Sequence, residues 1–283
     1  MTVQPDYAIF GIGKGRGGPS PLLPERAVKG MGKRISALLY RFIRFMVWVF
    51  YPKTKVEGLE HLPEGPCLVV GNHAQMHGPI ACELYFPGKH FTWCAGEMMR
   101  LREVPDYAFR DFWRDKPRTI RWLFRLFSYL IAPIAVCVFN NAGCIAVNRD
   151  VRVMSTFRET LQRLREGGRV IIFPEKDSPG NGILWEFQDR FVDVARMYWR
   201  QTGEALSFVP LYVAPARRTL YLGEALTFDP AGEAAGERQR IARGLSDAIT
   251  GLARSLPRHR VVPYRPMPKK QYPYNDASEV RCS

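Results

Sequence analysis

The chain has 283 residues, of which 46% are hydrophobic and 24% charged, a balance typical of a soluble globular protein with one large domain or two small ones. Lysine and arginine outnumber aspartate and glutamate by 41 to 27, so the sequence predicts an anionic partner surface: nucleic acid, phospholipid headgroups or a phosphorylated cofactor. No recognisable nucleic-acid-binding module accompanies this charge, so we predict no nucleic-acid partner. The alternative is that the positive charge of the protein does not serve to bind a partner.

The cysteines and the first thirty residues indicate the cellular compartment of the protein. The 6 cysteines form no Cys-x-x-Cys pair, and most lie in apolar surroundings, as reduced core thiols do. Residues 1–30 hold no continuous apolar run of the kind a secretory signal requires. These features predict a reducing, cytoplasmic compartment.

Residues 1–30 are predicted to be a flexible basic tail. Their Gly-Lys run at 11–18 lacks the G-x-x-x-x-G-K-[ST] spacing of a phosphate-binding loop. Residues 31–54 are predicted to form an amphipathic, membrane-associating helix, because basic and bulky aromatic residues suit a helix lying among lipid headgroups. The alternative is a helix packed on its own domain. The apolar residues at helical spacing are Ile35, Leu38, Leu39, Phe42, Ile43, Met46, Val47 and Phe50.

Strands and helices then alternate over residues 55–256, which predicts one α/β domain with a mainly parallel or mixed sheet flanked by helices. The strands are expected at 67–70, 90–95, 143–147, 169–173, 208–213 and 219–222, and the helices near 78–86, 118–132, 151–166, 186–201 and 233–255. Leu126–Phe139 is almost wholly apolar but too short to span a bilayer, so we expect a buried helix, with partial membrane insertion as the alternative. Residues 257–283 are predicted to be a surface-wrapping or disordered tail.

Two short polar stretches, 71–79 and 173–178, each follow directly on a β-branched apolar run. Because an α/β sheet presents its working residues where strands end, both stretches are expected at one rim of one sheet. His73 and Glu175 would then line the same crevice, which has the outline of an active site.

Four blocks of sequence, in order over roughly residues 55–215, resemble the glycerophospholipid acyltransferase superfamily, which contains the 1-acylglycerol-3-phosphate acyltransferases. Asn72-His73 resembles the opening of the family's His-x4-Asp block, and residues 143–149 resemble its second block, an apolar strand that ends in Arg149. Residues 173–175 match the start of Phe-Pro-Glu-Gly-Thr-Arg-Ser, and residues 209–211 resemble the final Val-Pro block.

The resemblance implies an O-acyltransferase of phospholipid biosynthesis in which His73 is the general base. It would move a fatty acyl group from an acyl-CoA or acyl-carrier-protein thioester to a lysophospholipid or glycerol-phosphate-type hydroxyl, without a further cofactor. It also implies substrate contacts by Asn72, Arg149 and Glu175. This chain lacks the arginine of the Phe-Pro-Glu-Gly-Thr-Arg-Ser block, and Lys176 is its nearest substitute. Such a protein is expected in the cytoplasm, peripheral to the inner face of a membrane.

The sequence departs from the family where the orienting aspartate should stand, because Gly78 occupies that position. Losing this carboxylate costs about 10⁴ in rate in a Ser-His-Asp enzyme. His77, Asp177 or Glu175 would have to orient His73 instead. We predict catalytic roles for His77 and Asp177, and a substrate contact for Glu175.

Two further interpretations stay open. The first is a non-catalytic lipid-binding relative that has kept the fold and lost the dyad. The second is a metal-dependent hydrolase, since His73-x3-His77 has metal-ligand spacing on a helix. The zinc-protease version of that spacing needs a glutamate at position 74, where this chain has alanine, and no third ligand is evident, so no metal site is predicted.

Overall fold

The computed structural model describes residues 25–113, 116–148, 153–178 and 180–276, with side chains from Lys33 onward. Within these residues, eight strands form one mixed sheet in the order β1-β7-β6-β2-β5-β3-β4, with β8 paired to β6. The predicted α/β fold class is therefore confirmed. The strands are β1 (Lys55–Glu57), β2 (Cys67–Gly71), β3 (His90–Ala95), β4 (Cys144–Val147), β5 (Arg169–Ile172), β6 (Ser207–Ala214), β7 (Thr219–Leu222) and β8 (Leu226–Thr227).

The centre of the sheet is β2, which runs parallel to both β5 and β6. All five of its residues are buried, and successive side chains alternate between two cores. Leu68 and Val70 face the core formed with α5 (Val153–Arg165), α6 (Asp193–Thr202) and α7 (Ala234–Ser255), whereas Cys67 and Val69 face the core formed with α2 (His77–Tyr85). This burial on both faces explains why the strand reads as a continuous apolar run.

All six predicted strands are present to within one residue at each end. Helix α5 ends at Arg165 in a glycine cap: Gly167 has φ 75°, and the Gly168 amide donates to the Arg163 carbonyl at 2.9 Å, as in a Schellman cap. The helix expected near 186–201 begins only at Asp193. Helix α3 (Val104–Phe112) and the short strands β1 and β8 were not predicted from the sequence.

Helix α1 spans Glu25–Phe50, so it begins inside the range expected to be a tail, and residues 1–24 lie outside the described part of the chain. Its small and polar face packs on the domain: Asn141 donates to Ser36 Oγ at 2.9 Å, and Arg44 Nε donates to Glu83 at 3.2 Å. The apolar side chains on its other faces lie in solvent, with Leu38 63%, Phe42 62% and Phe50 79% exposed.

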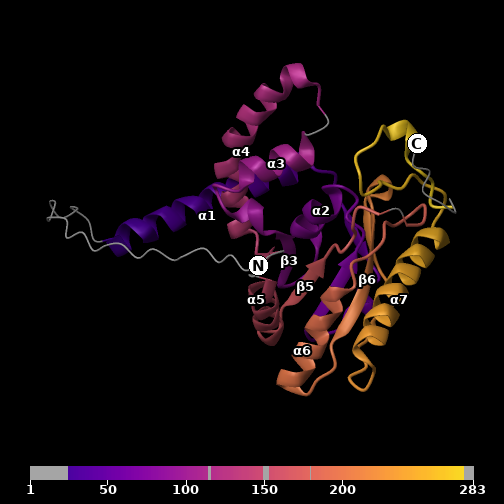
Figure 1. Ribbon diagram of the computed structural model, residues 1–283. Coiled ribbons are helices and arrows are strands. Elements are labelled where there is room, and N and C mark those ends of the chain that lie inside the picture. Colours follow the sequence, from indigo (N-terminus) through magenta and orange to yellow (C-terminus); the bar gives the residue numbers. More distant parts are fainter. Residues whose placement is uncertain (1–24, 114–115, 149–152, 179, 277–283) are drawn as a thin grey trace, which may run out of the picture.

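Helix α4 (Arg121–Asn141) corrects the expectation of a buried helix. It packs through a narrow stripe of small residues, so only Ser128, Ala132 and Cys137 are buried, while Trp122 is 69% and Leu130 58% exposed. The span 118–141 is the one stretch in the described residues that is long and apolar enough to cross a membrane, and only 22% of its most apolar part is buried. Figure 1 shows α3 and α4 gathered on the side of the molecule away from α7, with α1 extending beyond them.

The segment expected to be a C-terminal tail packs on the domain as far as Asp276. His259 is buried and accepts a hydrogen bond from the Tyr212 hydroxyl at 2.8 Å, and Asn275 is buried beside the end of α7. Between them, residues 260–274 form a loop whose two ends are paired by a bridge between Arg260 and Tyr274. We refer to residues 260–274 as the C-terminal loop.

Candidate active site around His73

Asn72 joins the ends of two neighbouring strands. Its side-chain Nδ2 donates to the Val213 carbonyl at 3.1 Å, and its Oδ1 accepts from the Val213 amide at 2.7 Å. The residue is 1% exposed. Both polar ends of this side chain thus bind the backbone of β6 and brace the two strand ends, and the substrate contact expected for Asn72 stays a prediction.

His73 lies in a tight turn between β2 and α2. The turn requires left-handed backbone at Ala74 (φ 46°) and Gln75 (φ 56°), a conformation that non-glycine residues adopt at a cost. It brings the Gln75 carbonyl oxygen against His73 Nδ1. Because a carbonyl only accepts, Nδ1 carries the proton in the neutral ring and Nε2 holds the free lone pair. Burial lowers the pKa of His73, which favours this neutral form.

Glu175 meets His73 at the same rim of the sheet, as the sequence predicted. The carboxylate is 4% exposed and accepts two backbone hydrogen bonds: Oε2 from the His73 amide at 2.6 Å, and Oε1 from the Trp185 amide at 2.9 Å. Burial raises the pKa of Glu175 to about 7, against the opposing effect of both amides. Since both oxygens bind backbone, this carboxylate braces the turn, and its predicted substrate contact stays a prediction.

Aromatic side chains surround the His73 ring. Phe173 lies 5.4 Å from it between ring centroids, and Tyr264 of the C-terminal loop lies 5.9 Å from it, almost perpendicular. Trp185 lies 5.8 Å from Tyr264 in turn. Edge-to-face ring contacts of this kind hold the imidazole in place.

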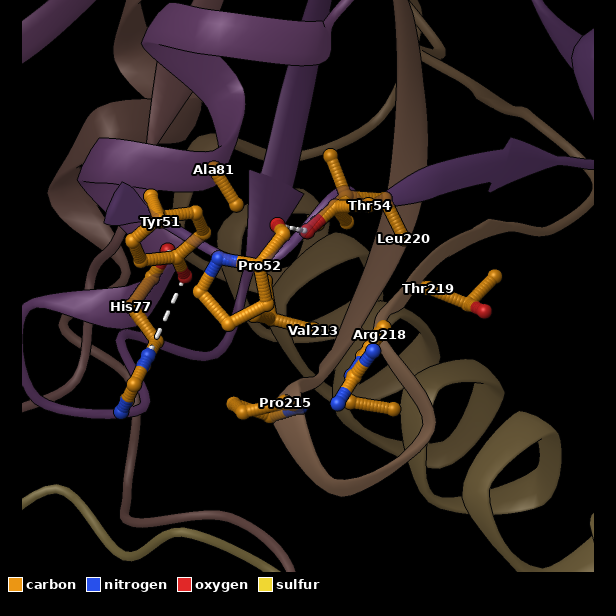
Figure 2. A pocket seen from close by; sticks show the side chains of 11 residues that line it. Tyr51, Pro52, Thr54, His77, Ala81, Val213, Pro215, Arg218, Thr219 and Leu220 are labelled. Carbon is orange, nitrogen blue, oxygen red and sulfur yellow. Dashed lines mark hydrogen bonds between the residues drawn. The ribbon is translucent and has the colours of Figure 1, made fainter. Parts of the chain in front are cut away.

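His77 points elsewhere. Its Nδ1 lies 3.1 Å from the Tyr51 hydroxyl, and burial, followed by the nearby charge of Lys269, lowers the pKa of His77. Figure 2 shows this pair beside a cavity of about 40 Å³, enough for a few water molecules. The cavity is lined by Tyr51, Pro52, Thr54, His77, Ala81, Val213, Ala214, Pro215, Arg218, Thr219 and Leu220.

Asp177 and Lys176 lie on the exposed rim. Asp177 forms an ion pair with Arg265 of the C-terminal loop, and Lys176 Nζ lies 2.7 Å from Glu186 Oε2. Within the described residues, the hydrogen bond of the His73 ring goes to Gln75, so neither His77 nor Asp177 orients the ring in this structure. Arg149 lies outside the described residues, and its expected phosphate contact stays a prediction.

Gly78 explains why the orienting aspartate has no place in this chain. A Cβ atom at this position would lie 2.8 Å from the His73 carbonyl oxygen and 2.9 Å from Phe173 Cε1. Real Cβ atoms do not approach backbone oxygens this closely. The turn that gives His73 its carbonyl partner therefore excludes a side chain at residue 78.

Sequence reasoning missed the Gln75 carbonyl, Trp185 and the C-terminal loop residues Tyr264 and Arg265. A backbone carbonyl leaves no residue-type signal, and the tail lies about 190 residues from His73 along the chain. In the described part of the chain, no group of three or more His, Cys, Asp or Glu side chains could hold a metal ion.

No family model and no curated protein matches this chain. Among solved structures, the chain is similar to the crystal structure of the 1-acyl-sn-glycerophosphate (LPA) acyltransferase PlsC from Thermotoga maritima. That similarity has 16% sequence identity and a TM-score of 0.39, and it covers 82% of this chain and 84% of that chain. A likeness of this size carries no functional argument, so function rests here on the residues of the site.

Proposed function

We propose that the protein is an O-acyltransferase that moves a fatty acyl group from an acyl-CoA or acyl-carrier-protein thioester to the hydroxyl of a lysophospholipid or a glycerol phosphate. The observation that supports this most directly is the orientation of His73, whose Nδ1 bonds the Gln75 carbonyl while Nε2 keeps its lone pair. A neutral imidazole held in one tautomer is the standard general base for an alcohol.

The proposed reaction uses this lone pair twice. His73 Nε2 takes the proton of the acceptor hydroxyl as the oxygen attacks the thioester carbonyl and forms the new C–O bond. Collapse of the tetrahedral intermediate breaks the C–S bond, and the imidazolium returns its proton to the departing thiolate. The products are an ester and a free thiol, and His73 is again neutral.

A backbone carbonyl replaces the aspartate only in part. It holds the correct tautomer, whose loss accounts for the cost of about 10⁴ when a triad aspartate becomes asparagine. It carries no full negative charge, however, so it stabilises the transient imidazolium less than a carboxylate would. We therefore expect a working enzyme that is slower than one with the His-x4-Asp pair.

We further propose that the protein works at the inner face of a membrane. Two helices in contact, α1 and α4, expose bulky apolar side chains that a soluble domain would normally bury. The net charge of +14 favours anionic headgroups. This arrangement suits a peripheral protein whose helices lie in the headgroup region and whose substrates are amphiphiles.

The experiment is acyl transfer from radiolabelled acyl-CoA, and separately from acyl-carrier protein, to a panel of lysolipids by purified protein in detergent. His73→Ala is expected to lower transfer by about 10²–10⁴-fold while lysolipid binding survives, because base catalysis contributes little affinity. His90→Ala, on β3, is the control. Wild-type protein that binds lysolipid but never transfers acyl groups would favour the non-catalytic lipid-binding alternative.

A further inference from the structure

The C-terminal loop is fastened to the domain at both ends. Its two ends, which we call the neck of the loop, are paired by the bridge between Arg260 and Tyr274. The Val261 amide also donates to the Pro273 carbonyl at 2.8 Å. Just outside the neck, the Asn275 side chain accepts from the His259 amide at 2.8 Å and donates to the Ala253 carbonyl at 2.8 Å. A loop pinned in this way holds its tip in one place.

Three contacts hold this loop against the candidate site. The Tyr264 ring packs edge-on against His73, the Arg265 guanidinium pairs with Asp177, and the Tyr272 hydroxyl accepts a hydrogen bond from Gln75 Nε2 at 3.1 Å. The first two contacts come from consecutive residues. Arg265 is therefore the chain neighbour of the residue that packs on the proposed general base, and it pairs with the strand-end segment that follows Glu175.

We propose that the C-terminal loop is a wall of the substrate site, and that Arg265 recognises the anionic phosphate group of the acceptor. The inference rests on the proposed function, because it names the chemical class of one substrate at the same site. Its ligand is a single-chain amphiphile with a phosphate monoester or diester headgroup.

The chemistry of the rim supports this assignment. A guanidinium binds phosphate through planar, paired donors, and Arg265 is 60% exposed, so incoming headgroups can reach it. Its partner, Asp177, is 52% exposed, and an ion pair between such exposed groups is worth little in water. A phosphate anion can therefore displace the Asp177 carboxylate at small cost. Lys269 of the same loop adds positive charge beside His77.

This assignment gives Arg265 and Asp177 opposite effects, which an orienting role for Asp177 would not. Arg265→Gln removes the guanidinium and is expected to weaken binding of a lysophosphatidate about tenfold or more. Asp177→Asn removes the competing carboxylate and is expected to tighten the same binding about threefold or more. Neither change should alter binding of a monoacylglycerol with the same chain, which carries no phosphate.

Binding is measured on the full chain by equilibrium dialysis of radiolabelled lysophosphatidate and monoacylglycerol below their micellar concentrations, without any thioester donor. Arg200→Gln is the matched control, because Arg200 is an exposed arginine at the end of α6, near the opposite end of the parallel strands. Arg265→Lys should restore part of the lost affinity, since lysine keeps the charge but not the fork of donors.

Equal weakening of both ligands by Arg265→Gln would overturn the proposal, as would weaker lysophosphatidate binding by Asp177→Asn. Wild-type protein with no preference for lysophosphatidate over monoacylglycerol would also overturn it. Because no acyl donor is present, these outcomes are independent of turnover. A protein that shows the expected binding pattern yet never transfers acyl groups would refute the acyltransferase proposal and leave the role of Arg265 standing.

Discussion

The backbone amide of His73 donates a 2.6 Å hydrogen bond to the carboxylate of Glu175, and the two residues come from different strand ends. This bond joins the turn after β2 to the segment after β5, and the second oxygen of Glu175 extends the link to Trp185. One buried carboxylate thus holds three segments of the site together.

Glu175→Gln is expected to destabilise the protein by about 1–3 kcal/mol, because the amide nitrogen of glutamine would face one of the two backbone donors. The loss should depend on pH. With a folded pKa of about 7, above the unfolded value near 4.5, the folded state holds the proton more tightly. The stabilisation of the folded state by the proton on Glu175 is therefore fully present below about pH 4.5, and it is lost as the pH rises through 7.

Urea unfolding at pH 5 and pH 8 tests this prediction. The advantage of wild type over Glu175→Gln should shrink by about 2 kcal/mol at the higher pH. Glu186→Gln, a change in an exposed carboxylate, should show no comparable pH dependence. Equal advantages at the two pH values would mean that the carboxyl is ionised throughout.

The pH profile of acyl transfer should reflect the buried imidazole. Burial lowers the pKa of His73, so the base stays unprotonated to lower pH than a free histidine. As the pH is lowered, we expect kcat/KM to stay level past pH 6.5 and to fall only at a lower pH. Circular dichroism at each pH separates this fall from unfolding, and a midpoint above 6.5 would contradict the assignment of His73 as a neutral buried base.

Gly78→Asp, which places an aspartate where the acyltransferase superfamily that the chain resembles has one, should abolish activity instead of raising it. The added Cβ would press on the His73 carbonyl and on Phe173, so the turn must move and His73 would lose its orientation. Gly78→Ala adds the same Cβ without a carboxylate and should be nearly as damaging. A gain in transfer by Gly78→Asp alone would show that the turn can rearrange around a dyad.

His77→Ala should leave turnover within a few-fold of wild type, because His77 bonds Tyr51 and not His73. The same reasoning predicts that Tyr51→Phe behaves like His77→Ala in both kcat and KM. Steady-state kinetics on the two variants provide the measurement. A large fall in kcat with unchanged KM for His77→Ala would restore the catalytic role predicted from the sequence.

Liposome binding should depend on exposed apolar residues of α1 and α4 together. Phe42→Ser and Leu130→Ser are each expected to weaken binding to anionic vesicles about tenfold, from the lost transfer of one large side chain. Leu59→Ser is the control, since Leu59 is 48% exposed but lies on neither helix. Flotation assays at low and high salt also test the charge, because binding should fall as ionic strength rises. Unchanged flotation for both variants would exclude this surface.

The sequence predicted the sheet well because its strands carry their signal locally. The run Cys67–Val70 is apolar on both faces, and such a run fits a buried parallel strand whatever surrounds it. The position of His73 and Glu175 at the rim of the sheet followed from the same logic, and the two residues do lie together there.

Two features of the molecule depended on long-range packing that no local pattern carries. The exposure of α4 could not be foreseen, since an apolar run of this length reads the same whether core, membrane or solvent surrounds it. Tyr264 was hidden for a different reason: a Pro- and Tyr-rich tail gives no sign of where it docks. Its position depends on the buried pair Tyr212 and His259, which contact each other only in the folded chain.

The Gln75 carbonyl has a consequence for genetics. Every amino acid supplies a carbonyl at position 75, so no codon change deletes this acceptor, and a complete alanine scan would leave the partner of His73 undetected. Chemical synthesis can weaken this acceptor, which mutation cannot do. Semisynthesis with an α-hydroxy acid at position 76 turns the Gln75–Met76 amide into an ester, whose carbonyl is a poorer acceptor. Sequence comparison has the same limit, because a backbone carbonyl leaves no signal in an alignment.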